Sequence, residues 1–139
     1  MKVNIVYWSG TGNTEAMANL IRQGAESKGA EVQVKPVDQA QDADLNCDIL
    51  ALGCPSMGEE ELEETEFEPY FASLEKQLAG RRLALFGSYG WGDGEWMEDW
   101  TKRARDLGAE LVATSLVVNE GPEGDEAQRC REYGAALVG

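Results

Sequence analysis

The stretch YWSGTGNTEAMA, from Tyr7 to Ala18, decides the fold of this chain. It ends an apolar run, Val3–Trp8, whose β-branched and aromatic residues are typical of a buried strand. It then crosses a turn of glycines and small polar residues and enters a helical pattern. The apolar residues of that helix recur every three or four positions before a stop at Lys28-Gly29: Met17, Leu20, Ile21 and Ala25. A turn of this composition between a strand and a helix suits a small ligand.

The rest of the chain repeats this alternation. We predict further strands over Glu31–Val37, Asp48–Cys54, Arg82–Ser88 and Leu111–Val118. We predict further helices over Phe67–Leu78, Trp96–Leu107 and Glu126–Val138. Pro36 favours an edge strand because proline has no N–H to donate. The pattern indicates one α/β domain over residues 1–139, with a doubly wound, five-stranded parallel sheet and helices on both faces.

The charge balance is strongly acidic. Twelve Lys and Arg residues stand against 26 Asp and Glu residues, which gives a net charge of −14. Seven of the ten residues from Glu59 to Glu68 are acidic. Such a surface repels nucleic acid and anionic membranes, and it favours a basic protein partner. The alternative is that the charge only keeps the protein soluble. We expect a monomer.

Histidine and cysteine usage excludes several classes of site. The chain has no His, which removes histidine-based catalysis and most metal sites. Its three cysteines, Cys47, Cys54 and Cys130, show no CxxC or zinc-ligand spacing. Met1 leads straight into a strand and no run approaches the ~18 apolar residues of a membrane span. We therefore expect a cytoplasmic protein with reduced thiols and no metal.

The first turn, Ser9–Thr14, has the composition of a phosphate site without a cation. Its glycines allow close backbone approach, and a helix N-terminus presents unpaired N–H groups to an anion. The lysine of the GxxxxGK[ST] nucleotide loop is missing, and Glu15 occupies the third glycine position of the GxGxxG dinucleotide motif. A terminal monophosphate remains as the ligand. The alternative is a structural turn capped by Ser and Thr.

Two later turns supply a planar-ring site at the same edge of the sheet. Trp91 stands between glycines in Ser88–Gly94 and offers a flat face, unless it covers the core instead. Met57 in Pro55–Glu61 adds a soft thioether on a neighbouring loop. A phosphate and a planar ring roughly 10 Å apart, as strands spaced by about 4.8 Å would place them, describe FMN.

Three motifs in order resemble the flavodoxin family, particularly its short-chain members. They are YWSGTGNTE from Tyr7, GCPSMGEEELEE from Gly53 and ALFGSYGWGDGEWM from Ala84. The resemblance covers nearly the whole chain and implies the flavodoxin-like strand order 2-1-3-4-5 with non-covalent FMN as cofactor. It implies phosphate contacts from the side chains of Ser9, Thr11, Asn13, Thr14 and Ser88, and from the loop backbone at Gly10 and Gly12. Pro55 departs from the serine of some relatives, which leaves Ser56 as an open replacement.

The resemblance also assigns the ring-binding residues. Met57 and Trp91 would bracket the isoalloxazine, and the peptide Gly58–Glu59 would face flavin N5. Glu60 would accept a hydrogen bond from N3–H. Backbone N–H groups of Tyr89, Gly90, Trp91 and Gly92 would face the pyrimidine oxygens. The family is not enzymatic: it carries single electrons at low potential, through the quinone, semiquinone and hydroquinone states, in place of or alongside ferredoxin. Its partners would be basic reductases and oxidases of the ferredoxin-dependent type.

Two features would tune the potentials. A carboxylate about 12 Å from the ring opposes its reduction by roughly 0.7 kcal/mol at an effective dielectric near 40. Several such charges lower the second one-electron potential by on the order of 100 mV. Turning the Gly58–Glu59 carbonyl toward N5 could require a positive φ at Glu59, which costs a glutamate ~1 kcal/mol.

Three other functions compete with this interpretation. A small FMN-dependent NAD(P)H:quinone reductase would need a substrate pocket over the flavin, usually built by longer loops. A phospho-accepting receiver domain would need acidic residues at the ends of the first and third strands, where Trp8-Ser9 and Cys54-Pro55 stand. A structural module without cofactor would leave Trp91 between its glycines unexplained.

Overall fold

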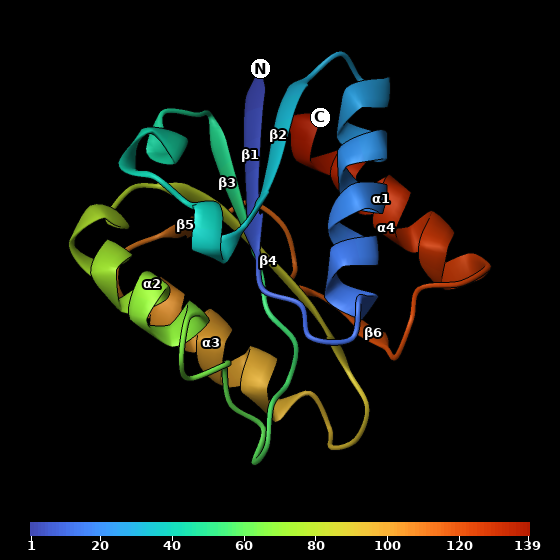
Figure 1. The fold of residues 1–139 in the computed structure, drawn as a ribbon. Helices are drawn as coiled ribbons and strands as arrows, with labels where there is room; N and C mark the ends of the chain where they lie inside the picture. Colours follow the sequence, from blue (N-terminus) through green and yellow to red (C-terminus); the bar gives the residue numbers. More distant parts are fainter.

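A parallel sheet forms the middle layer of the molecule, with two helices on each side (Figure 1). The computed structural model describes residues 1–139 throughout. The strands are β1 (Lys2–Tyr7), β2 (Glu31–Pro36), β3 (Ile49–Gly53), β4 (Arg82–Tyr89), β5 (Glu110–Leu111) and β6 (Leu116–Asn119). Their order is β2-β1-β3-β4-β5, with β6 also paired to β4, and every pair is parallel. The predicted order and the edge position of β2 are confirmed.

The predicted strand Leu111–Val118 is wrong in one respect, because the structure divides it into β5 and β6. The Val112 N–H still donates to the Leu83 carbonyl at 3.0 Å, and the chain then leaves the sheet. At Ser115 the hydroxyl oxygen lies 2.7 Å from the Thr101 hydroxyl oxygen of a covering helix. This side-chain contact takes the place of continued pairing along the edge.

The helices are α1 (Asn13–Ser27), α2 (Phe67–Leu74), α3 (Glu95–Asp106) and α4 (Asp125–Val138). Figure 1 shows α1 and α4 on one face of the sheet and α2 and α3 on the other. The predicted helix Phe67–Leu78 is too long, since α2 ends at Leu74 and a 3-10 turn, η3 (Glu75–Gln77), follows. Two further 3-10 turns, η1 (Val37–Gln39) and η2 (Asp42–Leu45), were not predicted.

Aromatic packing fixes α2 and α3 against the sheet. The Trp100 ring meets Phe67 and Phe71 edge-on, with ring centroids 5.4 and 5.9 Å apart. The Trp96 indole N–H donates to the Cys54 carbonyl at 3.2 Å, which ties α3 to the end of β3. Loops that leave the carboxyl ends of β3 and β4 therefore start from rigid positions.

On the opposite face, glycines let α1 and α4 approach closely. A Cβ at Gly24 would lie 1.8 Å from the Arg131 carbonyl oxygen, and one at Gly134 would lie 1.9 Å from the Ile21 carbonyl oxygen. This contact anchors α1, whose N-terminus follows the Ser9–Gly12 turn. Because β1 has β2 on one side and β3 on the other, the order reverses there, and a ligand crevice is expected beyond these strands.

Candidate cofactor-binding site

A cavity of about 210 Å³ lies beyond the carboxyl ends of β1, β3 and β4. Residues from all three predicted loops line it: Ser9, Gly10, Thr11, Asn13, Thr14, Pro55, Ser56, Met57, Ser88, Tyr89 and Gly90. Trp8 and Glu120, which the sequence analysis left out of the site, line it as well. The other predicted residues, Gly12, Gly58, Glu59, Glu60, Trp91 and Gly92, lie in the same loops but outside this cavity.

The Ser9–Thr14 turn presents free backbone donors at the start of α1. The N–H groups of Gly10, Thr11, Asn13 and Thr14 donate no hydrogen bond within the chain. The Ser9 hydroxyl oxygen accepts from Gly12 N–H at 3.1 Å and from Glu15 N–H at 3.3 Å, which curls the turn. Gly12 has φ = 95°, a value that favours glycine. The free N–H groups and the helix N-terminus together favour an anion.

Two buried hydroxyls form the floor beneath these donors. The Thr14 and Ser88 side-chain oxygens lie 3.0 Å apart, and both residues are almost fully buried. One hydroxyl donates to the other, and the second retains its proton for a ligand. The arrangement joins α1 to β4 across the cavity.

Aromatic side chains of β1 and its end support the turn from below. The Tyr7 hydroxyl donates to the Glu15 carboxylate at 2.8 Å, and burial together with this bond raises the pKa of Tyr7 to about 12. The Trp8 ring lies so close to Gly10 that an added Cβ would stand 2.9 Å from it. The turn therefore requires glycine at position 10 for packing as well as for ligand approach.

The loop after β3 folds into a tight turn. Met57 and Glu61 exchange both backbone hydrogen bonds, at 2.9 and 3.0 Å. Gly58 and Glu60 inside the turn have positive φ values of 46° and 54°. Glu59 does not have a positive φ in this structure, so the strain falls on Glu60 instead.

Glu60 joins this turn to the loop after β4. Its carboxylate accepts a hydrogen bond from Glu95 N–H, the first residue of α3, at 2.9 Å. A Cβ at Gly92 would stand 2.6 Å from the Glu60 carboxyl carbon. Gly92 thus leaves room for a carboxylate that is held at the place where the two loops meet.

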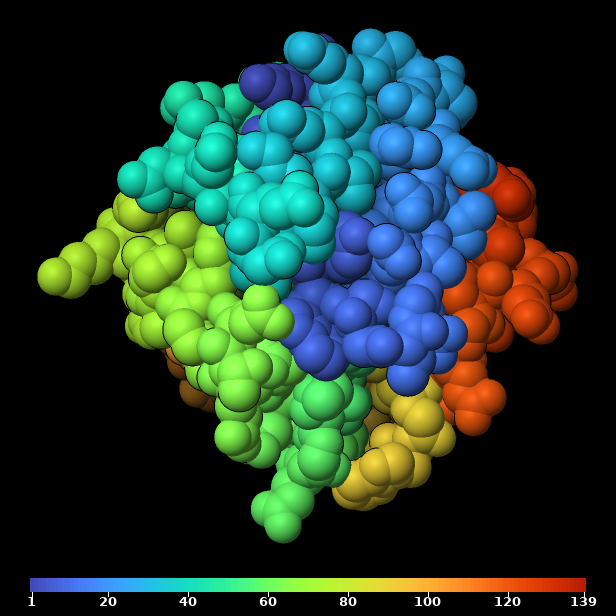
Figure 2. All heavy atoms as spheres, in the orientation of Figure 1, coloured from blue at the N-terminus to red at the C-terminus, as the bar shows by residue number.

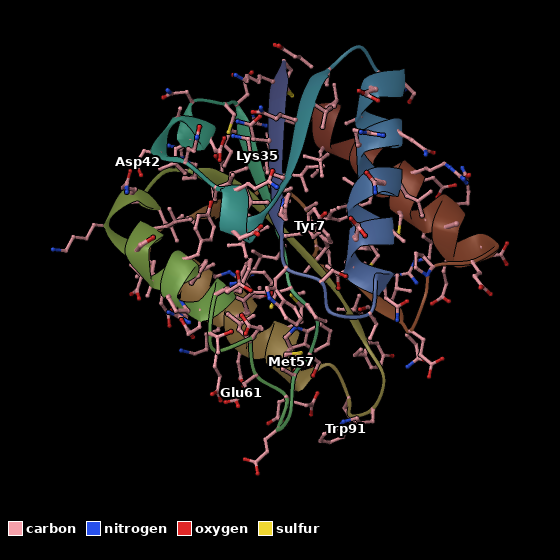
Figure 3. The ribbon with its side chains drawn as sticks, viewed as in Figure 1. Tyr7, Lys35, Asp42, Met57, Glu61 and Trp91 are labelled. Carbon is pink, nitrogen blue, oxygen red and sulfur yellow. The ribbon has the colours of Figure 1, made fainter.

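Met57 and Trp91 occupy these two loops at the same end of the molecule (Figure 3). Met57 is half-buried, whereas Trp91 exposes 66% of its surface, and apart from Met1 it is the only large hydrophobic residue so exposed. An indole this exposed contributes little to the core. Its position refutes the alternative that Trp91 covers the core.

Comparison with known proteins decides the family. The Flavodoxin family model matches residues 5–134. The chain is 50% identical over 137 residues to the flavodoxin of Megasphaera elsdenii, with 98% of both chains covered. It is 49% identical over 138 residues to that of Clostridium beijerinckii, covering 98% of this chain and 99% of the relative. The solution structure of two-electron reduced Megasphaera elsdenii flavodoxin superposes with a TM-score of 0.89 at 48% identity, over 98% of both chains.

The chain belongs to the flavodoxin family. Flavodoxins bind FMN and transfer electrons, and at this level of identity the chain is an FMN-binding electron carrier. The assignment favours the carrier over the quinone reductase considered above. The donor set fits the cofactor, since free N–H groups and neutral hydroxyls suit a phosphate ester and an exposed indole suits a planar ring.

In this flavodoxin-family chain a buried carboxylate, that of Glu63, holds the start of α2 just after the Met57–Glu61 turn. Glu63 accepts hydrogen bonds from the N–H groups of Thr65, Glu66 and Phe67 at 2.8–2.9 Å, and from the Thr65 hydroxyl. Burial alone would raise the pKa of Glu63, but these donors outweigh it and lower the pKa to about 2. Glu63 N–H in turn donates to the Cys54 sulfur at 3.4 Å.

Carboxylates crowd the exposed side of the same turn. Hydrogen bonding to Glu64, together with its charge, raises the pKa of Glu61. The charges of Glu60 and Asp99 raise the pKa of Glu95. Negative charge is therefore concentrated beside Met57 and Trp91.

Sequence reasoning missed a fourth loop, which follows β6. Glu120 lines the cavity, has φ = 60°, and donates its N–H to the Tyr89 carbonyl at 2.7 Å. A Cβ at Gly121 would lie 3.2 Å from the Asn13 side-chain oxygen. The position of this loop could have identified it, because Asn119–Gly124 follows the carboxyl end of a strand, as the other three loops do.

No group of three or more His, Cys, Asp or Glu side chains is placed to hold a metal ion. None of the helices combines the length and apolar character that crossing a membrane requires.

Proposed function

We propose that this chain is a low-potential, one-electron carrier for basic redox partners, with residues 1–139 acting as a single, monomeric FMN-binding domain. The phosphate binds to the free N–H groups of the Ser9–Thr14 turn and to the hydroxyls of Ser9, Thr11, Thr14 and Ser88, with the Asn13 amide. The observation that carries the proposal is this cation-free set of unused donors at the start of α1.

The ring end uses different residues. We place the isoalloxazine between Met57 and Trp91, with the Gly58–Glu59 peptide toward N5 and Glu60 toward N3–H. Backbone N–H groups of Tyr89–Gly92 meet the pyrimidine oxygens, and Pro55 and Ser56 line the path between the two ends. FMN supplies the electron chemistry, as an acceptor of one electron at a time.

The chain's own contribution to the potential is electrostatic. Glu59, Glu60, Glu61 and Glu64 surround the Met57–Glu61 turn, and Glu95 and Asp99 stand at the start of α3. Because reduction adds negative charge to the ring, these carboxylates oppose it and lower the potential. The charges of Glu60 and Asp99 raise the pKa of Glu95, which supports a concentration of negative charge there.

Cations are absent from every loop around the cavity. There is no Lys or Arg between Lys2 and Arg22, Lys35 and Lys76, Arg82 and Lys102, or Arg105 and Arg129. These gaps contain the four loops at the carboxyl ends of β1, β3, β4 and β6. A field of one sign steers a basic partner toward the exposed Trp91, and it repels a second copy of the chain. The cysteines Cys47, Cys54 and Cys130 are all free thiols, which suits the reducing cytoplasm.

Two measurements test this function. The purified protein should bind FMN and show a flavin absorption spectrum that dithionite bleaches, and it should show no steady-state turnover of NADPH with quinone. Electron transfer to a basic acceptor such as cytochrome c should slow as salt rises from about 10 to 500 mM, because screening shortens the reach of the field. A colourless protein that takes up no FMN, or a transfer rate independent of salt, would contradict the proposal.

A further inference from the structure

A second concave surface lies beside the Trp91 loop. It is a groove of about 470 Å³ between α3 and the interrupted edge of the sheet, which we call the α3–β6 groove. Met97, Thr101, Leu111, Ala113 and Val117 form its floor, and Asp93, Glu98, Arg105, Thr114 and Ser115 form its rim together with Gly94. Its volume lies within the range, roughly 300–1,000 Å³, of pockets that hold ligands.

The break between β5 and β6 creates this groove. A continuous edge strand would pack its side chains against α3, but Ala113–Ser115 leave the sheet and the space stays open. Thr101 and Ser115 hydrogen-bond to each other across the groove, which uses one of their two hydroxyl protons and leaves the other for an outside acceptor. One backbone acceptor at this edge is already occupied, since Arg129 donates to the Val117 carbonyl at 3.2 Å. The groove itself is lined by side chains, so we expect an occupant to fill it with side chains.

The two ends of the groove carry opposite charges. Asp93 and Glu98 stand at the end next to the Trp91 loop, and Arg105 stands about 10 Å away along α3, seven residues at 1.5 Å each. Arg105 is exposed and forms no ion pair, whereas Arg103 is bound by Glu68 and Glu75. The groove is therefore negatively charged at the Trp91 end and positively charged at Arg105, so a bound segment can lie in it in only one favourable orientation.

We propose that the α3–β6 groove docks a surface segment of the basic electron-transfer partner. The segment carries an apolar side chain that fills the groove, a Lys or Arg that meets Asp93 and Glu98, and an acidic residue that meets Arg105. Charge complementarity sets the orientation of the segment. Because Asp93 lies two residues from Trp91, docking here would bring the partner's redox centre close to the Trp91 loop. This inference rests on the proposed function, because it specifies where that partner binds.

The first test fills the groove. Thr114→Trp places an indole on the exposed rim, and Gln128→Trp adds the same side chain to the exposed surface of α4 as a matched neutral control. With an NADPH-dependent ferredoxin reductase as electron donor, Thr114→Trp should raise KM about fivefold or more, as blocking a central apolar contact does. Gln128→Trp should change KM less than about twofold. Equal effects of the two variants would overturn the proposal.

The second test separates docking from bulk charge. Arg105→Glu and Lys102→Glu change the net charge equally and lie on the same helix, but Lys102 is outside the groove and paired with Asp106. If only the overall field mattered, both variants would lower KM for a basic partner. Docking predicts that Lys102→Glu lowers KM slightly and Arg105→Glu raises it about threefold or more. A decrease in KM for both would show that Arg105 makes no contact.

Two controls distinguish this inference from the proposed function. FMN affinity should stay unchanged in all four variants, since none of these residues lines the cofactor cavity, and the two neutral Trp variants should also keep both one-electron potentials. If electron transfer depends on salt but the groove variants keep the KM of the unmodified protein, the docking proposal alone is overturned. If the protein fails to bind FMN, the proposed function is overturned. If sedimentation shows a dimer that dissociates in Thr114→Trp, the groove binds a second copy of the chain, and the proposal is also overturned.

Discussion

The Ser9–Thr14 turn and the Met57–Glu61 turn face the same ligand, but their construction differs. The first is supported from below by Tyr7, Trp8 and the buried Thr14–Ser88 pair, and its free groups are neutral donors. The second is exposed, carries positive φ at Glu60, and is surrounded by carboxylates. The contrast suggests a division of labour, in which the supported turn determines how tightly FMN binds and the exposed turn determines its potentials.

Removing the ligand's phosphate should have the largest effect. Riboflavin lacks the group that the Ser9–Thr14 turn binds, and each hydrogen bond to a charged group contributes about 1.5–3 kcal/mol. Three such bonds predict that riboflavin binds at least about a thousandfold more weakly than FMN. Fluorescence titration measures both affinities. Equal affinities would show that the ring end, and not the Ser9–Thr14 turn, provides the binding energy.

Removing the buried hydroxyl pair should have the next largest effect. Thr14→Val leaves Ser88 buried without its partner and should cost about 2 kcal/mol in FMN binding, as should Ser88→Ala. The double variant should lose less than the sum of the two, because neither hydroxyl is then left unpaired. Isothermal titration of all four proteins measures the coupling. Strict additivity would show that the two hydroxyls act independently.

The buried carboxylate of Glu63 should make the free energy of unfolding depend on pH in the acid range. Folding lowers its pKa from 4.5 to about 2, so its contribution is present above pH 4.5 and is lost as the pH falls toward 2. Glu63→Gln should therefore lower the free energy of unfolding at pH 7 by about 1–3 kcal/mol and flatten the acid side of the profile. Urea unfolding between pH 2.5 and 7 measures this. The matched control Glu64→Gln, an exposed neighbour, should leave the pH profile steep.

Glu59→Gly should have the smallest effect, and on the potentials only. If turning the Gly58–Glu59 peptide needs positive φ at Glu59, glycine removes a cost of ~1 kcal/mol and separates the two one-electron potentials further by about 40 mV. Glu59→Gln removes the charge without that backbone freedom and serves as control. Potentiometry that finds the same separation in both variants would show that backbone freedom at Glu59 does not control the potentials.

The same contrast explains which features could be predicted from sequence. The Ser9–Thr14 turn is continuous in sequence, so its glycines and hydroxyls indicated a phosphate site directly. Glu120 could not be identified in this way, because it reaches the cavity only through the pairing of β6 with β4. Leu111–Val118 reads as one strand, and its break depends on a contact between Ser115 and Thr101 that only the packed α3 provides. The attachment of Glu60 to Glu95 likewise joins residues 35 positions apart.

We infer that neutral donors alone hold the bound phosphate as a dianion. Hydrogen bonds to the charged form of an acid lower its pKa, so the second pKa of the bound phosphate should fall well below its usual value of about 6. Phosphorus NMR of the FMN-bound protein measures this directly between pH 5 and 8. We expect a resonance that stays constant across this range. A resonance that titrates near pH 6, as that of free FMN does, would contradict it.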